Sequence, residues 1–293
     1  MTDNADDKNN THDEFYLLKT IPDVLRARGF RLYLEGGQRL VDLWLNGGAA
    51  ALGHTPANLL REIKNTASRG LYAPLPHFTE KRFIKALSKL LPGFNFRVYA
   101  APPRELIELF LKGNPQRGTK DYSAKLWRPF TDPLNPFLSD CASLIIPIIP
   151  GIQTWRGGLP YGLCVAAFKH GGQGTPVKTD SVEINKLIKI LPPSDILPPV
   201  LLAAATRGIY DLLASPERAK PKLPRVLKTL ENSRWTRSGI YLHLKEKPAS
   251  DEWEKLFNKF LEAGFLPPPS PEFPLILPGE MSDGEEAKLA TAL

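Results

Sequence analysis

The sequence predicts an α/β protein, and three stretches carry that prediction. Near the start, two runs of alternating apolar and polar residues flank Gly36-Gly37, and residues with helical spacing follow. In the middle, apolar strand-like runs alternate with helical patterns, and near the end a strand, a helix, a strand and a helix follow in turn. With 293 residues, the chain can bury on the order of 75% of its unfolded surface.

The N-terminal stretch predicts a β-hairpin followed by two helices. Apolar residues alternate over 30–35 and again over 41–45, with the glycine pair as a tight turn between them. Gly47-Gly48 allow close backbone approach, and Thr55-Pro56 is typical of an N-cap followed by proline at the first helical position. Amphipathic helices are expected from Pro56 to Gly70 and from a Thr79 cap to residue 91.

The middle of the chain predicts strands and helices separated by proline. A strand over 94–99 and a helix over 104–112 flank Pro102-Pro103, whereas 113–140 is expected to be irregular. The apolar run 143–150 contains prolines, so any strand in it should be short or lie at a sheet edge. Residues 162–168 are suited to a buried strand, 169–175 to a glycine-rich surface turn, and helices are expected over 181–190 and 200–213.

The C-terminal stretch has clear boundaries. A strand is expected over 240–244, a helix from a Ser250 cap to Gly264, and a strand over 275–277. Ser282 and Glu285 have the spacing of a capping box that opens the last helix.

Composition excludes several classes of protein. The net charge of +7 comes from basic residues scattered among 31 acids, without a nucleic-acid motif, so we expect a solvated basic surface and no nucleic acid. No apolar run approaches the roughly 18 residues of a membrane span, and the polar residues 1–15 are expected to be a disordered tail rather than a signal peptide. Two cysteines, Cys141 and Cys164, are too few for a disulfide scaffold, which indicates the cytoplasm.

Residues 29–56 carry a family resemblance. Their pattern has three parts: an extended "G-x-x-L-x-L-x-x-G-x-x-L-x-D" hairpin, a small-residue loop and Leu52-Gly53-His54-x-Pro56. This order resembles the start of class III aminotransferases, enzymes of fold type I that depend on pyridoxal phosphate (PLP). The passages 264–270 and 275–280 resemble the small C-terminal domain of the same enzymes. The resemblance implies that the segment lies near a dimer interface and frames a pocket, with Asn46, Gly47, Gly48 and His54 as its candidate residues.

The sequence departs from the family where the cofactor would be held. Pro102-Pro103 stands in place of the Ser-Gly turn whose amides hold the phosphate, and 144–149 contains no aspartate for the pyridine nitrogen. The run 153–162 resembles the lysine motif "K-x-x-x-G-G-x-P-x-G", which puts Gln153 at the position of the Schiff-base lysine unless this short match is a coincidence. The resemblance therefore implies a shortened and degenerate member, and we expect no cofactor.

These observations predict a reduced PLP-transferase-like sheet with a small α+β C-terminal domain. The expected divisions are a tail at 1–15, a hairpin-helix segment at 16–92, a reduced central α/β domain at 93–205 and the C-terminal domain at 206–293. No Cys-His, Ser-His-Asp or metal-ligand spacing is present, and His54 and Asp42 are interpreted as a capping or interface histidine and a turn or edge-strand residue.

Three functions stay open on the sequence. The first is a homodimeric binding or partner protein, with a small-molecule ligand as one option. The second is a working PLP enzyme that uses a displaced lysine, Lys169. The third is an anion- or nucleic-acid-binding module that uses the positive charge.

Overall fold

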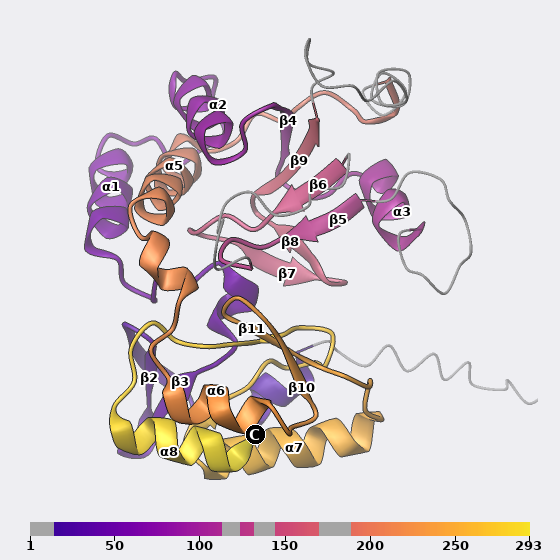
Figure 1. The fold of residues 1–293 in the computed structure, drawn as a ribbon. Coiled ribbons are helices and arrows are strands. Elements are labelled where there is room, and N and C mark those ends of the chain that lie inside the picture. Colours follow the sequence, from indigo (N-terminus) through magenta and orange to yellow (C-terminus); the bar gives the residue numbers. More distant parts are fainter. Residues whose placement is uncertain (1–14, 113–123, 132–143, 170–188) are drawn as a thin grey trace, which may run out of the picture.

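The computed structural model describes residues 15–112, 124–131, 144–169 and 189–293, and these form two packed halves (Figure 1). The upper half in Figure 1 is built on a sheet with the order β4-β9-β6-β5. Its strands are β4 (Phe94–Tyr99), β5 (Ala124–Trp127), β6 (Leu144–Pro147) and β9 (Cys164–Lys169). Strand β9 runs antiparallel to both β4 and β6, whereas β5 and β6 are parallel.

Strand β9 is buried on both faces because every second side chain points to the opposite side of the sheet. Val165 and Ala167 belong to the core beneath α2 (Thr79–Leu90) and α5 (Pro199–Leu213). Cys164 and Ala166 belong to a separate core beneath α3 (Arg104–Lys112). Helix α1 (Ala57–Ala67) packs on α5 beside α2, and a hairpin of β7 (Thr154–Arg156) and β8 (Leu159–Tyr161) precedes β9.

The lower half joins the two ends of the chain. The hairpin strands β1 (Val24–Arg28), β2 (Arg31–Leu34) and β3 (Arg39–Asp42) form one sheet with β12 (Phe265–Leu266), which pairs in parallel with β3. The other elements of this half are β10 (Trp235–Ser238), β11 (Tyr241–Leu244), β13 (Leu275–Ile276), α6 (Pro224–Leu230), α7 (Ser250–Glu262) and α8 (Asp283–Ala292). Short 3-10 turns lie at Tyr16–Thr20, Glu35–Gly37, Leu45–Gly48 and Pro216–Ala219.

One hydrophobic core runs through the lower half. It combines residues between Leu17 and Ala51 with residues between Leu212 and Ala292, so the ends of the chain pack together as the sequence predicts. The expected boundaries at 92 and 205 stay predictions. The two hydrophobic cores draw on alternating stretches of the chain, so neither core corresponds to one continuous segment.

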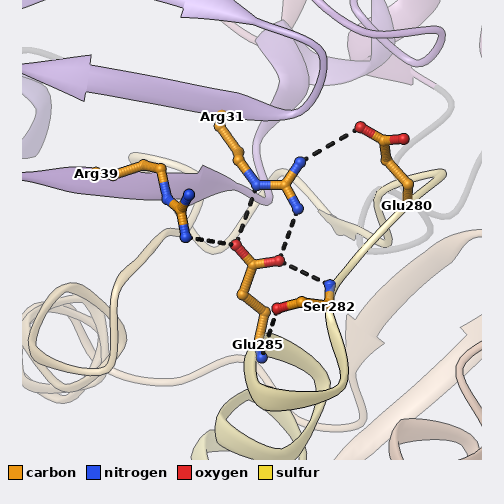
Figure 2. A network of polar contacts seen from close by, with 5 residues as sticks. All are labelled: Arg31, Arg39, Glu280, Ser282 and Glu285. Carbon is orange, nitrogen blue, oxygen red and sulfur yellow. Dashed lines mark hydrogen bonds and ion pairs between the residues drawn. The ribbon is translucent and has the colours of Figure 1, made fainter.

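A polar network holds the hairpin to the last helix (Figure 2). The Glu285 carboxylate accepts hydrogen bonds from Arg31 Nε at 3.0 Å and Nη2 at 2.7 Å, and Arg39 Nη2 lies 3.3 Å from it. Arg31 Nη1 also reaches Glu280 at 3.3 Å. Glu285 and Ser282 form the predicted capping box of α8, so the same carboxylate caps the helix and ties it to the N-terminal strands.

Several local expectations need correction. Thr55, Thr79 and Ser250 were predicted as N-caps, but the caps of α1, α2 and α7 are Pro56, Phe78 and Ala249, and none makes a side-chain capping bond. At α2 the reason is that His77 Nδ1 accepts the Thr79 N–H at 3.3 Å and so takes the capping role. Strand β6, with four residues, meets the expectation of a strand that is short or at an edge, and it lies inside the sheet between β9 and β5.

Some predicted features lie outside the described residues: the tail over 1–14, most of 113–140, Cys141, the turn over 170–175 and most of the helix over 181–190. In the parts of the chain that the structure describes, no helix is both long and apolar enough to cross a bilayer.

Candidate functional site

The candidate site begins where β3 ends, in a turn with unusual backbone geometry. Leu45, Asn46 and Gly47 have φ angles of 45°, 49° and 63°, which is the left-handed region. A residue with a side chain costs roughly 1–2 kcal/mol there, and such strained segments concentrate at functional sites. The turn is held by the Asp42 carboxylate, whose Oδ1 accepts the N–H groups of Trp44 at 2.8 Å and Leu45 at 2.9 Å.

Asp42 also binds His54, in a pair whose carboxylate is buried and whose imidazole is partly exposed. His54 Nε2 lies 2.8 Å from Asp42 Oδ2, and the His54 N–H donates to the Gly29 carbonyl at 2.8 Å. Asp42 is only 2% exposed and lies on β3 between β2 and β12, so its interpretation as a turn or edge-strand residue is wrong. A carboxylate can be buried here because three hydrogen bonds replace its water.

A cavity of about 370 Å³ adjoins this pair. Asp42, Trp44, Asn46 and His54 form part of its wall, and residues between 18 and 24 with two leucines of β2 and β12 form the rest. Its volume lies within the range of small-molecule sites. The structure thus brings two of the predicted pocket residues, Asn46 and His54, to one cavity.

Gly47 and Gly48 serve a packing role within the chain. A Cβ on Gly47 would lie 2.5 Å from carbon atoms of the Trp155 ring, and one on Gly48 would lie 3.5 Å from the Tyr241 hydroxyl. Trp155 Nε1 donates to the Asn46 carbonyl at 2.9 Å, and Asn46 Nδ2 donates to the Gln153 carbonyl at 2.8 Å. The close backbone approach expected here is therefore made to the β7 segment of the same chain.

Gln153 occupies a closed interior position. It is 3% exposed, its Oε1 accepts the Ile149 N–H at 3.3 Å, and its Nε2 donates to the Leu163 carbonyl at 2.8 Å. The side chain thus bridges the chain after β6 to the chain before β9. Lys169 is not brought to this place, because it lies at the far end of β9, about 20 Å along the strand from Leu163.

The turn before α3, at residues 100–103, is the place to which the sequence resemblance assigns a phosphate site. Here the Ala100 N–H donates to Asp195 Oδ2 at 2.9 Å, and the N–H groups of Leu106 and Ile107 bond to the Pro103 carbonyl. Pro102 and Pro103 have no N–H, so this turn offers few free donors to an anion. At these two places, Gln153 and this turn, the structure therefore has a bound amide and a proline turn, with neither a lysine amine nor a row of free backbone donors.

A buried arginine beside the site was missed by sequence reasoning. Arg218 is 7% exposed, and its guanidinium donates to the carbonyls of Ala51, at 2.9 Å, and Leu277. Burial lowers the pKa of this guanidinium to about 10, and the group lies 5.2 Å from the centre of the Phe30 ring. The residue comes from a basic, proline-punctuated segment in which nothing distinguishes it from solvated neighbours.

The structure also limits other chemistry. Burial raises the pKa of the Cys164 thiol to about 12, which makes it a poor nucleophile. Among the described residues, no group of three or more His, Cys, Asp or Glu could hold a metal ion.

Comparison with known sequences identifies partial relatives. No family model matches the sequence. An uncharacterized protein of Treponema pallidum (strain Nichols) is 36% identical over 115 residues, which is 39% of this chain and 37% of the relative. An uncharacterized protein of Borreliella burgdorferi is 44% identical over 68 residues, 23% of this chain and 25% of the relative. The matched region thus spans less than two fifths of either relative.

Solved structures show similarity over most of the chain. An ω-transaminase from Sphaerobacter thermophilus has a TM-score of 0.57 with 12% identity and covers 92% of this chain and 89% of its own. An ornithine aminotransferase from Plasmodium yoelii has a TM-score of 0.59 with 10% identity, over 92% of this chain and 91% of the aminotransferase. An acetylornithine aminotransferase from Elizabethkingia anophelis has a TM-score of 0.56 with 10% identity and the same coverage. The chain therefore has an α/β fold similar to that of the PLP-dependent aminotransferases.

Proposed function

We propose that this protein is an aminotransferase-fold protein without Schiff-base chemistry, and that it acts as a binding or partner protein. The environment of Gln153 is the observation that carries the proposal. A Schiff base requires a lysine amine that can condense with the aldehyde of the cofactor, and an amide cannot do so. Both ends of the Gln153 amide are bound to main-chain groups, so the position that the motif resemblance assigns to a catalytic lysine serves as a structural bridge.

The contacts around the expected cofactor support the same proposal. The prolines at 102 and 103 remove donors that a phosphate would need, and β6 contains no carboxylate for a pyridine nitrogen. Charged hydrogen bonds contribute roughly 1.5–3 kcal/mol each, so the loss of several is not offset by one new contact.

Reconstitution with PLP tests the proposal directly. The protein would be incubated with excess PLP, reduced with borohydride and digested, and the pyridoxyl-modified peptides would be quantified by mass spectrometry. We expect low, scattered labelling of exposed lysines. The alternative, a working enzyme that uses Lys169, predicts one stoichiometric adduct on the Lys169 peptide that disappears in Lys169→Arg. That result would refute the proposal.

We also propose that the protein forms a homodimer. An exposed apolar surface between α1 and α2 supports this: Tyr72, Leu75 and Phe78 are 70%, 48% and 50% exposed, and Leu60 of α1 is 40% exposed. Large apolar side chains that stay exposed close together along the chain are a common feature of protein interfaces. Light scattering should give about twice the chain mass of 32.6 kDa, and Tyr72→Ser with Leu75→Ser should shift it toward the monomer. A wild-type monomer at micromolar concentration would contradict the dimer.

The cavity beside Asp42 and His54 is the proposed binding site for a small molecule. Its wall combines apolar side chains with a few polar ones, which is the usual composition of a ligand pocket. The polar groups are the carboxylates of Asp23 and Asp42, the Lys19 ammonium, the His54 imidazole and the Asn46 amide. A cytoplasmic location completes the proposal, since a buried free thiol at Cys164 is stable in a reducing compartment.

A further inference from the structure

A second cavity lies between the helices of the upper half, away from the Asp42–His54 site. It has a volume of about 400 Å³, and residues of α1, α2 and α5 line it. Four cationic side chains, Arg82, Lys85, Lys89 and Arg207, contribute to the lining, but only one carboxylate, that of Glu62, does so. The cavity is therefore strongly positive.

Three of these cations are not neutralised. Arg207 is paired with Asp211 on its own helix and also experiences the charge of Glu62. By contrast, among the residues that the structure describes, no ion pair joins Arg82, Lys85 or Lys89 to a carboxylate. Arg82 lies 4.5 Å from the Phe78 ring centre, and Lys89 lies 5.2 Å from that of Tyr210.

The spacing of the three cations makes their arrangement costly without a ligand. Residues 82, 85 and 89 follow one face of α2 at steps of three and four, which places successive Cβ atoms about 5–6 Å apart. Like charges at this spacing destabilise a helix, and here all three side chains line the same cavity while staying exposed to solvent. An anion bound among them would remove this repulsion.

We propose that this cavity binds the diphosphate group of a small molecule. A single phosphate monoester carries about −1.5 to −2 charges at neutral pH, so a diphosphate is needed to balance three cations. Guanidinium and ammonium groups together suit phosphate oxygens, the first by paired N–H groups and the second as a point charge. The volume fits a small ligand rather than an extended polymer. This site is distinct from the proposed binding site beside Asp42, since the two cavities share no lining residue.

Binding of inorganic pyrophosphate to matched variants tests the proposal. Isothermal titration at pH 7.5 would be run at constant ionic strength on the wild type, Lys85→Gln and Lys81→Gln. Lys81 is the control because it is an exposed lysine on the same helix that does not line the cavity. We expect the wild type and Lys81→Gln to bind equally, and Lys85→Gln to bind about tenfold more weakly or worse. At ten times the dissociation constant, pyrophosphate should raise the melting temperature by about 3 °C.

Several results would overturn the proposal. Equal affinities of the Lys85 and Lys81 variants would mean a non-specific charge effect. Equally tight binding of a tricarboxylate would remove the preference for phosphate, and tighter binding of a short single-stranded RNA would reassign the surface to nucleic acid. Absence of pyrophosphate binding by the wild type would exclude the site. Because Lys85 is exposed, Lys85→Gln should leave the fold intact, so its affinity can be compared with that of the wild type.

Discussion

Replacement of Glu285 by glutamine should remove an ion pair while leaving the helix cap in place. Glutamine at the third position of a capping box can still accept the Ser282 N–H, so the variant isolates the charge. Hydrogen bonds from Arg31 lower the pKa of Glu285 from an ordinary 4.5 to about 2. Since the group is largely buried, this depression corresponds to at most about 3 kcal/mol of folding free energy above pH 4.5.

The pH dependence has a definite sign. A carboxyl group whose pKa is lowered by folding stabilises the protein above its unfolded pKa, and the stabilisation is lost as the pH falls toward its folded pKa. For Glu285 the window runs from about pH 4.5 down to about pH 2. Urea unfolding at a series of pH values should show that the wild type exceeds Glu285→Gln by about 2–3 kcal/mol at pH 7, and that this difference shrinks across the window.

Glu280→Gln provides the control. Glu280 reaches the same Arg31 at 3.3 Å, but its side chain is 70% exposed, so its loss should cost less than about 0.5 kcal/mol. If both variants lost the same stability, or if the Glu285 difference did not change between pH 7 and pH 3, the buried-network argument would be refuted.

Two further predictions concern the candidate site. Gly47→Ala should lower the free energy of unfolding in urea by about 2–4 kcal/mol because its Cβ meets the Trp155 ring. The control is Gly37→Ala, at φ +85° with no atom within 4 Å, which should lose only the backbone strain of about 1–2 kcal/mol. Equal losses would contradict the packing argument. Asp42→Ala should cost more than His54→Gln, about 2–4 against about 1 kcal/mol, because it removes the acceptor of the buried Leu45 N–H and the part-buried Trp44 N–H as well as the partner of the histidine. Equal shifts in thermal unfolding would mean that these two backbone hydrogen bonds contribute little.

Local sequence patterns predicted the elements that depend on local physics. The strand at Phe94–Tyr99, the helix at Arg104–Lys112 and the capping box at Ser282 follow from periodicity and cap chemistry, and they are confirmed. The parallel pairing of β3 with β12 was not predicted, because strand partners distant in sequence leave no local pattern.

The candidate site was only partly predictable for a similar reason. Asn46, Gly47, Gly48 and His54 stood out through glycine and motif patterns, but the Asp42–His54 contact depends on the left-handed turn between them. Leu45 takes part in that turn, and because leucine rarely adopts a positive φ, its presence in the sequence does not predict one. The run Asn46-Gly47-Gly48, composed of residues that tolerate this region, was the available signal.

The pairing of β3 with β12 also has a consequence during synthesis. The hairpin leaves the ribosome about 220 residues before the strand that completes its sheet, which at ordinary elongation rates is a delay of roughly 10 to 45 s. During this interval the strand around Val41 has an unpaired edge and an uncovered apolar face. The segment that supplies their hydrogen-bond and packing partners has not yet been synthesised. The upper half, whose strands lie between, can fold first, so the lower half should close last and should be the part most dependent on chaperones in the cell.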